Sequence, residues 1–505
     1  MKKIFRIFAI VPALAFFSCD LDLYPVTSYN EGNVTVDESS ESQYSTRAQM
    51  QGLRDALYNS NARDIQEKGF LDWLVYNECR ADNAYCGSLT TGEIVAIEAN
   101  SQDGANKNVD RDWSWYLNQL TAANQIICNI DRVKENDPTL TDKEYQEWKS
   151  EAFCWRSLML YQMSQIWGAV PVITTIPPAI TAENIEDVYD DYYPARADID
   201  DVYERMITDL EYAVQYAPDV NHSNKFLFTK GFANGLLARI YAEKTRQDWN
   251  KVAQYCEAVE GMGYSLCEHY GDLWAYNDED TENRNTPESI FEVQWTRSSG
   301  NWVNWMLYRN AYDPDGSYSW AKWITPSRDL IAAYQVEGDT ERMNATIKFD
   351  ECTWSSYYPA ENYAFMNKVP TGATSIIVMR LAEIYLLHAE ALTMTGKLTG
   401  EDGAEGYVNK VRTRAGLAPL EPRATQSQEA MLDAVLHERR LELALEGFRF
   451  YDLVRHGKAK EIHDAMPLED PYWQPRYPLT DETILMPIPT TALEDNPRLV
   501  QNPGY

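Results

Sequence analysis

The chain has 505 residues, of which 45 are Lys or Arg and 77 are Asp or Glu, so its formal charge is −32 at pH 7. A surface this acidic repels nucleic acid and anionic membranes, because binding to either depends on Lys and Arg side chains. The length is sufficient for one large domain or for two to three ordinary domains.

The N-terminus has the features of a secretory signal. Basic residues within the first six positions precede an apolar run of 11 residues, Ile7–Phe17. This run is shorter than the roughly 20 residues that a membrane-spanning helix needs. Ser18 is small and Cys19 follows it, an order that resembles a bacterial lipoprotein signal in which the cysteine is acylated. The alternative is an ordinary signal peptide with a chance cysteine nearby.

The residues after Cys19 bear on where such a lipoprotein would be held. Asp20, Leu21 and Asp22 do not favour adhesion to anionic lipid, and they resemble the surface-export signal of lipoproteins in the Bacteroidetes. The stretch at 38–46 is rich in serine and suits a tether. We therefore predict a signal peptide at 1–18, a lipid anchor and tether at 19–45, and a location on the outer face of the outer membrane. Loss of the signal makes the charge about −35.

Seven cysteines remain if Cys19 carries lipid, and an odd, scattered set is not a disulfide framework. Cys79 and Cys86 are close enough in sequence to pair, but the pattern favours single buried thiols. No CxxC zinc motif occurs. The seven are Cys79, Cys86, Cys128, Cys154, Cys256, Cys267 and Cys352.

A first candidate for ligand recognition is the stretch NECRADNAYCG at 77–87. Arg80, Asp82, Asn83 and Tyr85 place a forked donor, an acceptor, an amide and an aromatic ring within six residues. Such a set is suited to the hydroxyl groups of a polyol. The structural alternative is an Arg80–Asp82 ion pair that holds a loop.

Helical periodicity dominates residues 46–266 and 379–460, which predicts a mainly α fold. Ala- and Tyr-rich helices of similar length resemble tetratricopeptide-type hairpins, although no clean 34-residue repeat occurs. We therefore expect helix pairs that pack like such repeats, followed by a C-terminal tail at 461–505. The predicted helical runs are Gln51–Tyr58, Tyr116–Val133, Ser150–Gly168, Ile199–Tyr216, Lys230–Lys244, Trp249–Glu260, Arg380–Lys397, Ala404–Arg414 and Glu429–Tyr451.

The stretch at 267–378 differs from the rest, because it is rich in Asn, Asp, Gly, Pro and Trp. Only Ser289–Trp295 and Thr374–Arg380 have the pattern of strands or extended segments. A loop-rich region of this length inside a compact domain is usually functional. We therefore predict that the helices form a scaffold and that 267–378 carries a binding site.

Aromatic residues are concentrated in that region, with 9 in the 33 residues from 291 to 323. They follow no helical period and lie among Gly, Ser, Asn and Asp, which suits the stacking of sugar rings on aromatic faces. Burial is the better interpretation of any single ring, but we expect at least two exposed platforms in the cluster. It comprises Phe291, Trp295, Trp302, Trp305, Tyr308, Tyr312, Tyr318, Trp320 and Trp323.

Enzyme signatures are missing from the sequence. His437-Glu438 begins like the zinc motif HExxH, but position 441 is Leu. There is no GxSxG motif and no Walker motif. The acidic group Asp278–Glu282 could hold calcium, although a solvated acidic loop is the better interpretation. We assign no catalytic residue, metal or cofactor.

The run HERRLELALEGFRFYDLVRHGK at 437–458 is predicted to be a scaffold helix. Leu441, Ala444, Leu445 and Phe448 form a core stripe. Charged residues spaced by three, from Glu446 to Arg455, predict ion pairs along its surface. Gly447 in its middle costs about 1 kcal/mol unless packing requires it.

This run also resembles the C-terminal signature of the RagB/SusD family, close to ERRxELxxEGxRxxDLxRxG. Further motifs of that family occur in the expected order, so the resemblance covers essentially all of the mature chain. They are WYLNQLTAANQIICNID at 115–131, PSRDLIAAY at 326–334, MRLAEIYLLHAEAL at 379–392, VNKVRTRAGL at 408–417 and the terminal QNPGY.

The resemblance implies a cell-surface lipoprotein on a tetratricopeptide-like scaffold, without catalysis. It implies a lid over a SusC-like TonB-dependent transporter in the outer membrane, which captures oligosaccharide for import. In the family, ligand contacts come from loops, and the corresponding places here are Arg80–Tyr85 and Trp302–Trp323. Trp320 and Trp323 are the individual residues we favour most.

Two alternatives remain open. Members of the family that capture peptides exist, and a peptide site would have fewer exposed aromatic platforms. A surface glycoside hydrolase would instead need two carboxylates in the aromatic cleft, for which Asp313 and Asp315 are the nearest residues in sequence.

Overall fold

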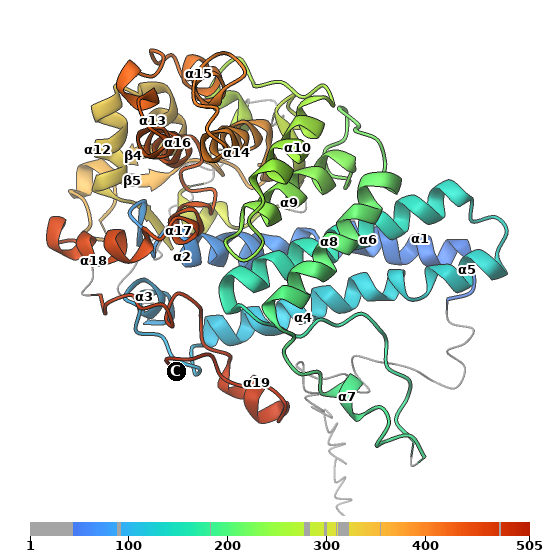
Figure 1. The fold of residues 1–505 in the computed structure, drawn as a ribbon. Helices are drawn as coiled ribbons and strands as arrows, with labels where there is room; N and C mark the ends of the chain where they lie inside the picture. Colours follow the sequence, from blue (N-terminus) through green and yellow to red (C-terminus); the bar gives the residue numbers. More distant parts are fainter. Residues whose placement is uncertain are drawn as a thin grey trace, which may run out of the picture.

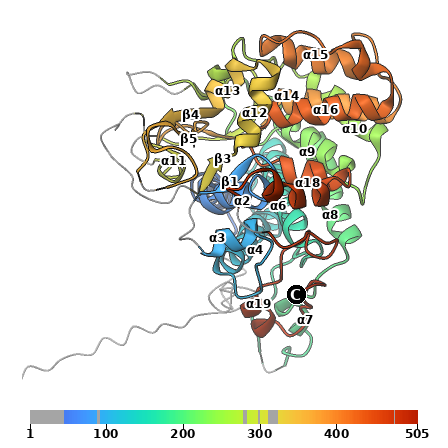
Figure 2. The same ribbon diagram turned by 90° about the vertical axis from the view of Figure 1, so that its left-hand side faces the viewer.

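The computed structural model is mainly helical and describes most of the chain (Figures 1 and 2). Cys19 and the acidic group at 278–282 lie outside the described residues, as do Trp320, Asp313 and Asp315. In the described part, no helix combines the length and the apolar character needed to cross a membrane. The described residues are 44–87, 92–181, 183–276, 283–296, 300–309, 311, 323–353, 355–473 and 476–505.

Long helices packed side by side form the scaffold, in agreement with the predicted mainly α fold. They are α1 Arg47–Ala56, α4 Lys107–Ile127, α5 Ile130–Asn136, α6 Asp142–Trp167, α8 Ile199–Tyr216, α9 Lys230–Ala242, α10 Trp249–Glu260, α14 Leu381–Met394, α15 Ala404–Arg414 and α16 Gln428–Glu442. The helices α4, α6, α8, α9, α10 and α14 contact one another in that order. The last of them, α14, also packs on α15 and α16. Figure 1 shows this succession from α1 and α5 at one end to α15 at the other.

Shorter elements complete the fold. The strands pair as β1 with β3, β2 with β6 and β4 with β5, each pair antiparallel. The short helices are α2 Trp73–Asn77, α3 Gly92–Glu98, α7 Tyr189–Tyr192, α11 Asn304–Leu307, α12 Arg328–Glu337, α13 Thr340–Thr346, α17 Arg449–Arg455, α18 Ala459–Glu469 and α19 Thr490–Asp495. The strands are β1 Ala84–Cys86, β2 Ser289–Val293, β3 Ile324–Pro326, β4 Ile347–Asp350, β5 Tyr363–Met366 and β6 Ile376–Arg380. Single turns of π or 3-10 helix occupy Leu57–Asn61, Arg63–Gln66, Glu67–Asp72, Tyr270–Trp274, Ala360–Asn362 and Pro422–Thr425.

Local sequence explains where several scaffold helices begin and end. The Thr141 hydroxyl accepts the backbone N–H of Glu144, and the Glu144 carboxylate accepts the backbone N–H of Thr141, which caps α6. The Asp248 carboxylate accepts the first free N–H groups of α10 in the same way. Gly396, with φ +80°, follows α14 and turns the chain away.

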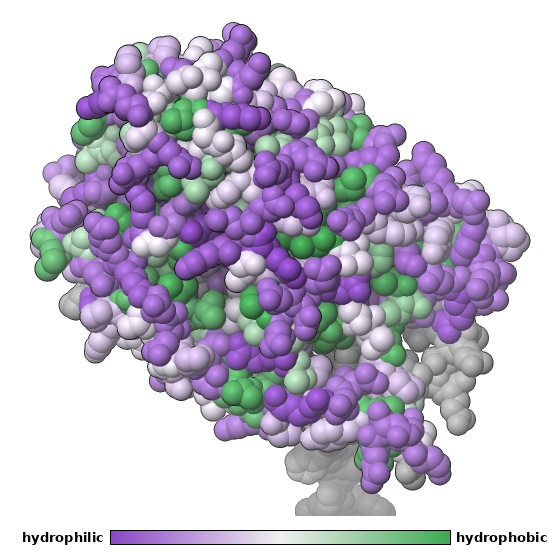
Figure 3. Space-filling view, viewed as in Figure 1, coloured by the Kyte–Doolittle hydropathy of each residue, from purple (hydrophilic) through white to green (hydrophobic). Residues whose placement is uncertain are grey.

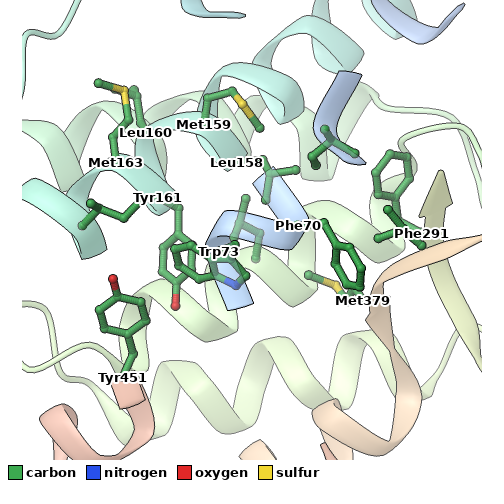
Figure 4. Packing of buried hydrophobic residues seen from close by; sticks show 14 of the residues in the cluster. Phe70, Trp73, Leu158, Met159, Leu160, Tyr161, Met163, Phe291, Met379 and Tyr451 are labelled. Atoms are coloured by element: carbon green, nitrogen blue, oxygen red, sulfur yellow. The ribbon is translucent and has the colours of Figure 1, made fainter. Parts of the chain in front are cut away.

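The hydrophobic core runs through the scaffold and continues beneath the loop-rich side. The second half of α6 is buried on every side, which explains why its sequence lacks a clear polar face. Figure 4 shows Trp73 of α2, Tyr161 of α6 and Tyr451 of α17 meeting in this core. The rings of Trp73 and Tyr451 lie 5.2 Å apart. Residues far apart in sequence therefore share one packed interior.

The three helices predicted as Ile199–Tyr216, Trp249–Glu260 and Ala404–Arg414 have those bounds in the structure. The two predicted strand segments are confirmed as β2 and β6, and they pair with each other. Residues 267–378 contain more regular structure than expected. In particular, α12 and α13 have clear N-terminal caps at Ser327 and Asp339.

The prediction of one continuous helix over Glu429–Tyr451 is wrong. The chain leaves the helical path after Glu442 and re-enters it at Arg449, as α16 and α17. Leu445 and Gly447 have φ values of +61° and +86°, which no α-helix accommodates. The charged side chains from Glu446 to Arg455 are at most 10% exposed rather than arrayed on a surface. Of the predicted i, i+3 pairs, Asp452–Arg455 forms, at 2.5 Å.

Single thiols were predicted for the cysteines. Cys79, Cys154, Cys256 and Cys267 are free and buried, in agreement with that prediction. Cys128 is free and exposed, and its sulfur lies 3.4 Å from the Thr174 carbonyl oxygen.

Candidate functional site

The loop-rich side gathers α11, β1, β3, β4 and β5 on one flank of the molecule (Figure 2). Trp302 lies just before α11, and Trp305 lies on it, with its backbone N–H donated to the Trp302 carbonyl at 3.1 Å. Trp323 lies just before β3, and its N–H donates to the Met306 carbonyl at 3.0 Å. The fold thus brings together three of the four predicted tryptophans, which the sequence separates by up to 21 positions.

The three tryptophans differ in exposure. Trp305 is 41% exposed and is among the most exposed large apolar side chains of the described residues. Trp302 and Trp323 are half-buried and pack against the main core with part of each ring. Among the other predicted aromatics, Phe291 and Trp295 are buried and Tyr308 is half-buried. Tyr312, Tyr318 and Trp320 lie outside the described residues.

Backbone hydrogen bonds hold α11 in place. The Trp302 N–H donates to the Gln66 side-chain oxygen at 3.1 Å, and the Ala311 N–H donates to the Pro370 carbonyl at 2.9 Å. These bonds fix both ends of the segment against the scaffold. We call Trp302, Trp305 and Trp323 the tryptophan platform. Its backbone is held in place by these bonds, which reduces the entropy lost when a ligand binds.

A buried amide lies next to Trp305. Asn304 is 1% exposed, and neither its Oδ1 nor its Nδ2 has a hydrogen-bond partner in the structure. A buried polar group without a partner costs about 1–3 kcal/mol. At this exposure the amide presents no surface to a glycan, but it can bond a buried water molecule.

The residues predicted at 80–85 are placed differently. Arg80, Asp82, Asn83 and Tyr85 are each at most 2% exposed. The Arg80 guanidinium donates to the Thr483 and Ile484 carbonyls at 2.8 and 2.9 Å and lies 4.1 Å from the centre of the Phe450 ring. Side chains buried in this way present no surface to a glycan, so they are not part of the site that we propose below.

Asp82 shows what these residues do instead. Its carboxylate accepts two bonds of 2.8 Å from the Arg449 guanidinium, and Arg440 lies 3.3 Å away. Burial alone would raise the pKa of Asp82, but the Arg440 and Arg449 charges hold it well below its usual range. The ion pair that holds the loop therefore forms with Arg449 and Arg440, and the expected alternative partner, Arg80, bonds elsewhere.

Tyr85 and Asn83 are likewise used internally. The Tyr85 hydroxyl donates to Asp470, and its ring stacks on Tyr357 at 4.8 Å. The Asn83 amide donates to Glu78 at 2.8 Å and accepts from Arg440 at 2.9 Å. The stretch 80–85 thus connects β1 to the C-terminal part of the chain.

A small cavity of about 60 Å³ lies in the core between α2, α6, α9 and the α16–α17 connection. Tyr161, Gln162, Glu243 and Phe448 are among the residues that line it, and Figure 4 shows the aromatic side. Its volume suits a few water molecules and is too small for an oligosaccharide. Burial raises the pKa of Glu243 to about 7, although the Arg455 charge opposes the shift.

We expect Glu243→Gln to remove the loss of folding stability that ionisation of the buried Glu243 carboxyl causes as pH rises. Because the pKa of Glu243 is raised in the folded state, its contribution to stability is complete below pH 4.5 and is lost as pH rises through about 7. The stability advantage of the variant over the natural chain should grow by about 2 kcal/mol between pH 5 and pH 8. Denaturant unfolding at both pH values measures this. Glu211→Gln, at an exposed position on α8, should give no such growth. If the free energy of unfolding changes equally between pH 5 and pH 8 in all three chains, the raised pKa of Glu243 is contradicted.

No group of three or more His, Cys, Asp or Glu side chains is arranged to hold a metal ion within the described ranges. The platform consists of the exposed Trp305 ring and the half-buried Trp302 and Trp323 rings. Such rings can stack on a neutral ligand.

Two family models match the chain. The model described as "SusD family" matches residues 361–505, and the model described as "Starch-binding associating with outer membrane" matches residues 36–242. A SusD-like protein of Bacteroides ovatus is 25% identical over 485 residues, which cover 88% of this chain and 80% of that protein.

Solved structures share the fold. A laminarin-binding SusD-like protein superimposes with a TM-score of 0.69 at 24% identity, over 92% of this chain and 100% of that one. Surface glycan-binding protein A from Bacteroides thetaiotaomicron, in complex with laminarihexaose, gives a TM-score of 0.70 at 19% identity, over 90% of this chain and 99% of that one. These likenesses show that the architecture is common to all three proteins.

Proposed function

The chain belongs to the RagB/SusD family, and on that premise we propose that it binds neutral oligosaccharide or polysaccharide at the cell surface. The observation that carries the proposal is the platform of Trp302, Trp305 and Trp323, in which the Trp305 ring is exposed. Aromatic faces stack on the C–H faces of sugar rings, and polar groups beside them bond the hydroxyls.

The charge of the chain supports a neutral ligand. A formal charge of −32 disfavours uronic or sulfated glycans, because like charges repel at long range. Two structural neighbours, a laminarin-binding protein and a surface glycan-binding protein bound to laminarihexaose, support a neutral glycan as the ligand class. Laminarin is therefore the first glycan to test, without being the assigned ligand.

The proposal extends to location and partner. A description of one matching family model mentions association with the outer membrane, and the N-terminal sequence resembles a lipoprotein signal ending at Cys19. We propose that acylated Cys19 anchors the chain on the outer face of the outer membrane. There the folded part would act as a lid for a SusC-like TonB-dependent transporter and deliver bound glycan for import. Trp320 stays in the proposed site with the other three tryptophans.

The platform supports binding without catalysis. A hydrolase needs two carboxylates at a fixed separation beside the ligand. Asp350, near the platform, accepts the Tyr308 hydroxyl and lies 3.8 Å from Arg309, so it is already engaged. A peptide ligand finds less support than glycan, because the exposed groups are mainly aromatic.

Trp305→Ala is expected to weaken glycan binding about tenfold, because it removes the exposed ring of the platform. The measurement is calorimetry of the soluble chain, without its signal and Cys19, after an affinity-gel screen of plant, host and microbial glycans. Trp323→Ala should have a smaller effect, since part of that ring packs in the core.

Tyr189→Ala is the matched control. Tyr189 is 42% exposed, close to the value for Trp305, but it lies on α7, far from α11 in Figure 2. Its loss should leave affinity unchanged. Release of a shortened glycan by the chain would contradict the binding-only proposal, and binding of peptides with no glycan bound would favour the alternative within the family.

A further inference from the structure

A second exposed aromatic surface lies beyond β3, at the opposite end of that strand from Trp323. Tyr472, in the loop after α18, is 44% exposed. Its ring covers the Arg328 guanidinium at 3.7 Å, and the half-buried Tyr358 ring lies 4.3 Å from the same guanidinium. We call Tyr472, Arg328 and Tyr358 the tyrosine clamp.

Hydrogen bonds to buried residues hold the tyrosine clamp in place. The Arg328 backbone N–H and Nη1 both donate to the Tyr85 hydroxyl, at 3.1 and 3.2 Å, and Nη2 donates to the Tyr357 carbonyl. The Tyr472 N–H donates to the Asp470 carboxylate at 2.9 Å. The Tyr472 ring is therefore ordered by a cation–π contact on one face while much of its surface remains exposed.

A row of aromatic contacts runs through the interior from the clamp to Tyr308, the residue that follows α11. Tyr308, which follows α11, lies 4.9 Å from Phe365, and Phe365 lies 4.8 Å from Tyr363. Tyr363 in turn lies 5.5 Å from Tyr358 of the clamp. The residues of this row belong largely to one cluster of buried and partly buried side chains.

The spacing along β3 sets the separation of the two surfaces. Trp323 precedes β3, and the Tyr358 hydroxyl donates to the carbonyl of Pro326, at the end of that strand, at 2.7 Å. Three residues of extended chain span about 10 Å. This distance is longer than a single sugar ring, so one monosaccharide cannot contact both surfaces.

We infer that the tyrosine clamp is a second subsite for the same glycan chain, so that the protein selects neutral oligosaccharides long enough to reach from the tryptophan platform to Tyr472. The inference rests on the proposed function. In the clamp, an ordered ring whose conformational freedom is already lost can stack on a distant sugar residue at low entropic cost. Affinity should therefore rise with chain length until both surfaces are covered.

The test compares a disaccharide with a hexasaccharide in each of five series: β-1,3-gluco-, cello-, malto-, manno- and xylo-oligosaccharides. In the series that binds, Tyr472→Ala should weaken the hexasaccharide about fivefold and leave the disaccharide within about twofold. Tyr472→Phe should retain the hexasaccharide affinity, because the ring is kept. Trp305→Ala should weaken both lengths.

Tyr477→Ala provides the matched control. Tyr477 is a 64% exposed tyrosine five residues further along, outside the aromatic row, and its loss should change neither affinity. If Trp305→Ala weakens the hexasaccharide and Tyr472→Ala, shown to be folded by its circular dichroism, does not, the second subsite is refuted and the proposed function stands. If the natural chain binds no series, the proposed function fails and this inference fails with it.

Discussion

Glu442→Gln is expected to lower the free energy of unfolding by about 3–5 kcal/mol, the typical cost of removing one partner from a buried ion pair. Glu442 is fully buried at the end of α16. Its carboxylate bonds Arg380 at 2.5 Å and Arg342 at 3.1 Å, and it also bonds Arg414. Burial alone would raise the pKa of Glu442, but these three guanidinium groups hold it well below its usual range.

The cost follows from the charge balance around Glu442. Five cations and five anions with buried side chains form one connected network, and Arg412 at its edge also pairs with the half-buried Glu337. Glutamine has nearly the same shape but no charge, so it leaves one positive charge without compensation in a region closed to solvent. The cations are Arg342, Lys368, Arg380, Arg412 and Arg414, and the anions are Glu288, Asp339, Glu438, Glu442 and Glu446.

Asp433→Asn is the control on the same helix. Asp433 pairs with Lys458 at a site where both side chains are at least 40% exposed, so its loss should change stability by less than about 1 kcal/mol. Denaturant unfolding followed by tryptophan fluorescence measures both variants. Equal, small effects would mean that the buried network contributes no more than a surface pair.

The sequence predicts this network only in part. Glu438, Glu442 and Glu446 are spaced by four, which places successive acids near one face of a helix, and this spacing indicates a row of charge. Their partners lie on β6, α13 and α15, so the pairing depends on tertiary structure. A helical pattern alone does not distinguish a solvated row of acids from a buried one. The predicted surface position of the charged residues from Glu446 to Arg455 was wrong for that reason, although the predicted pair Asp452–Arg455 forms.

The scaffold helices were more predictable, because their signals are local. The predicted bounds of Ile199–Tyr216 agree with α8, where apolar periodicity and the following Pro218 coincide. Similarly, the stop after α14 needs only Gly396. Both features are set by residues within a few positions of the helix end.

The candidate site was less predictable. A forked donor, an acceptor, an amide and a ring suit a polyol, and the same groups suit a buried structural node. The partners of Asp82, namely Arg440 and Arg449, lie more than 350 positions away, so they decide between these interpretations through the fold. Aromatic density, in contrast, indicated the flank that carries Trp305, although Trp305 alone is exposed among the described rings of the cluster, where at least two exposed rings were expected. Tyr472 was missed because 461–505 was interpreted as a C-terminal tail, although Tyr472, Trp473 and Tyr477 lie within six residues there.

The second large effect is expected at Gly447, between α16 and α17. Gly447→Ala should cost about 3 kcal/mol or more, since two penalties combine. The residue has φ +86°, a conformation that disfavours any side chain. A Cβ atom there would also lie 2.4 Å from two ring atoms of Trp73, which is 8% exposed and cannot move without disturbing the core.

The backbone at Gly447 has little freedom to shift away from Trp73. The N–H groups of Gly447 and Phe448 both donate to the buried Glu78 carboxylate, at 2.8 and 3.2 Å. The Trp73 ring is fixed in turn against Tyr451, 5.2 Å away. The break between α16 and α17 is therefore required for α17 to pack against α2. Glycine at position 447 is the residue that permits this break.

Gly457→Ala separates the two penalties. Gly457 has φ +69°, but nothing lies within 4 Å of a Cβ atom placed there, so its replacement should cost only about 1 kcal/mol. In a Trp73→Ala background, Gly447→Ala should likewise cost about 1 kcal/mol, because the ring that opposes the new methyl group is gone. An unchanged cost in that background would show that contact with Trp73 is not what makes position 447 a glycine.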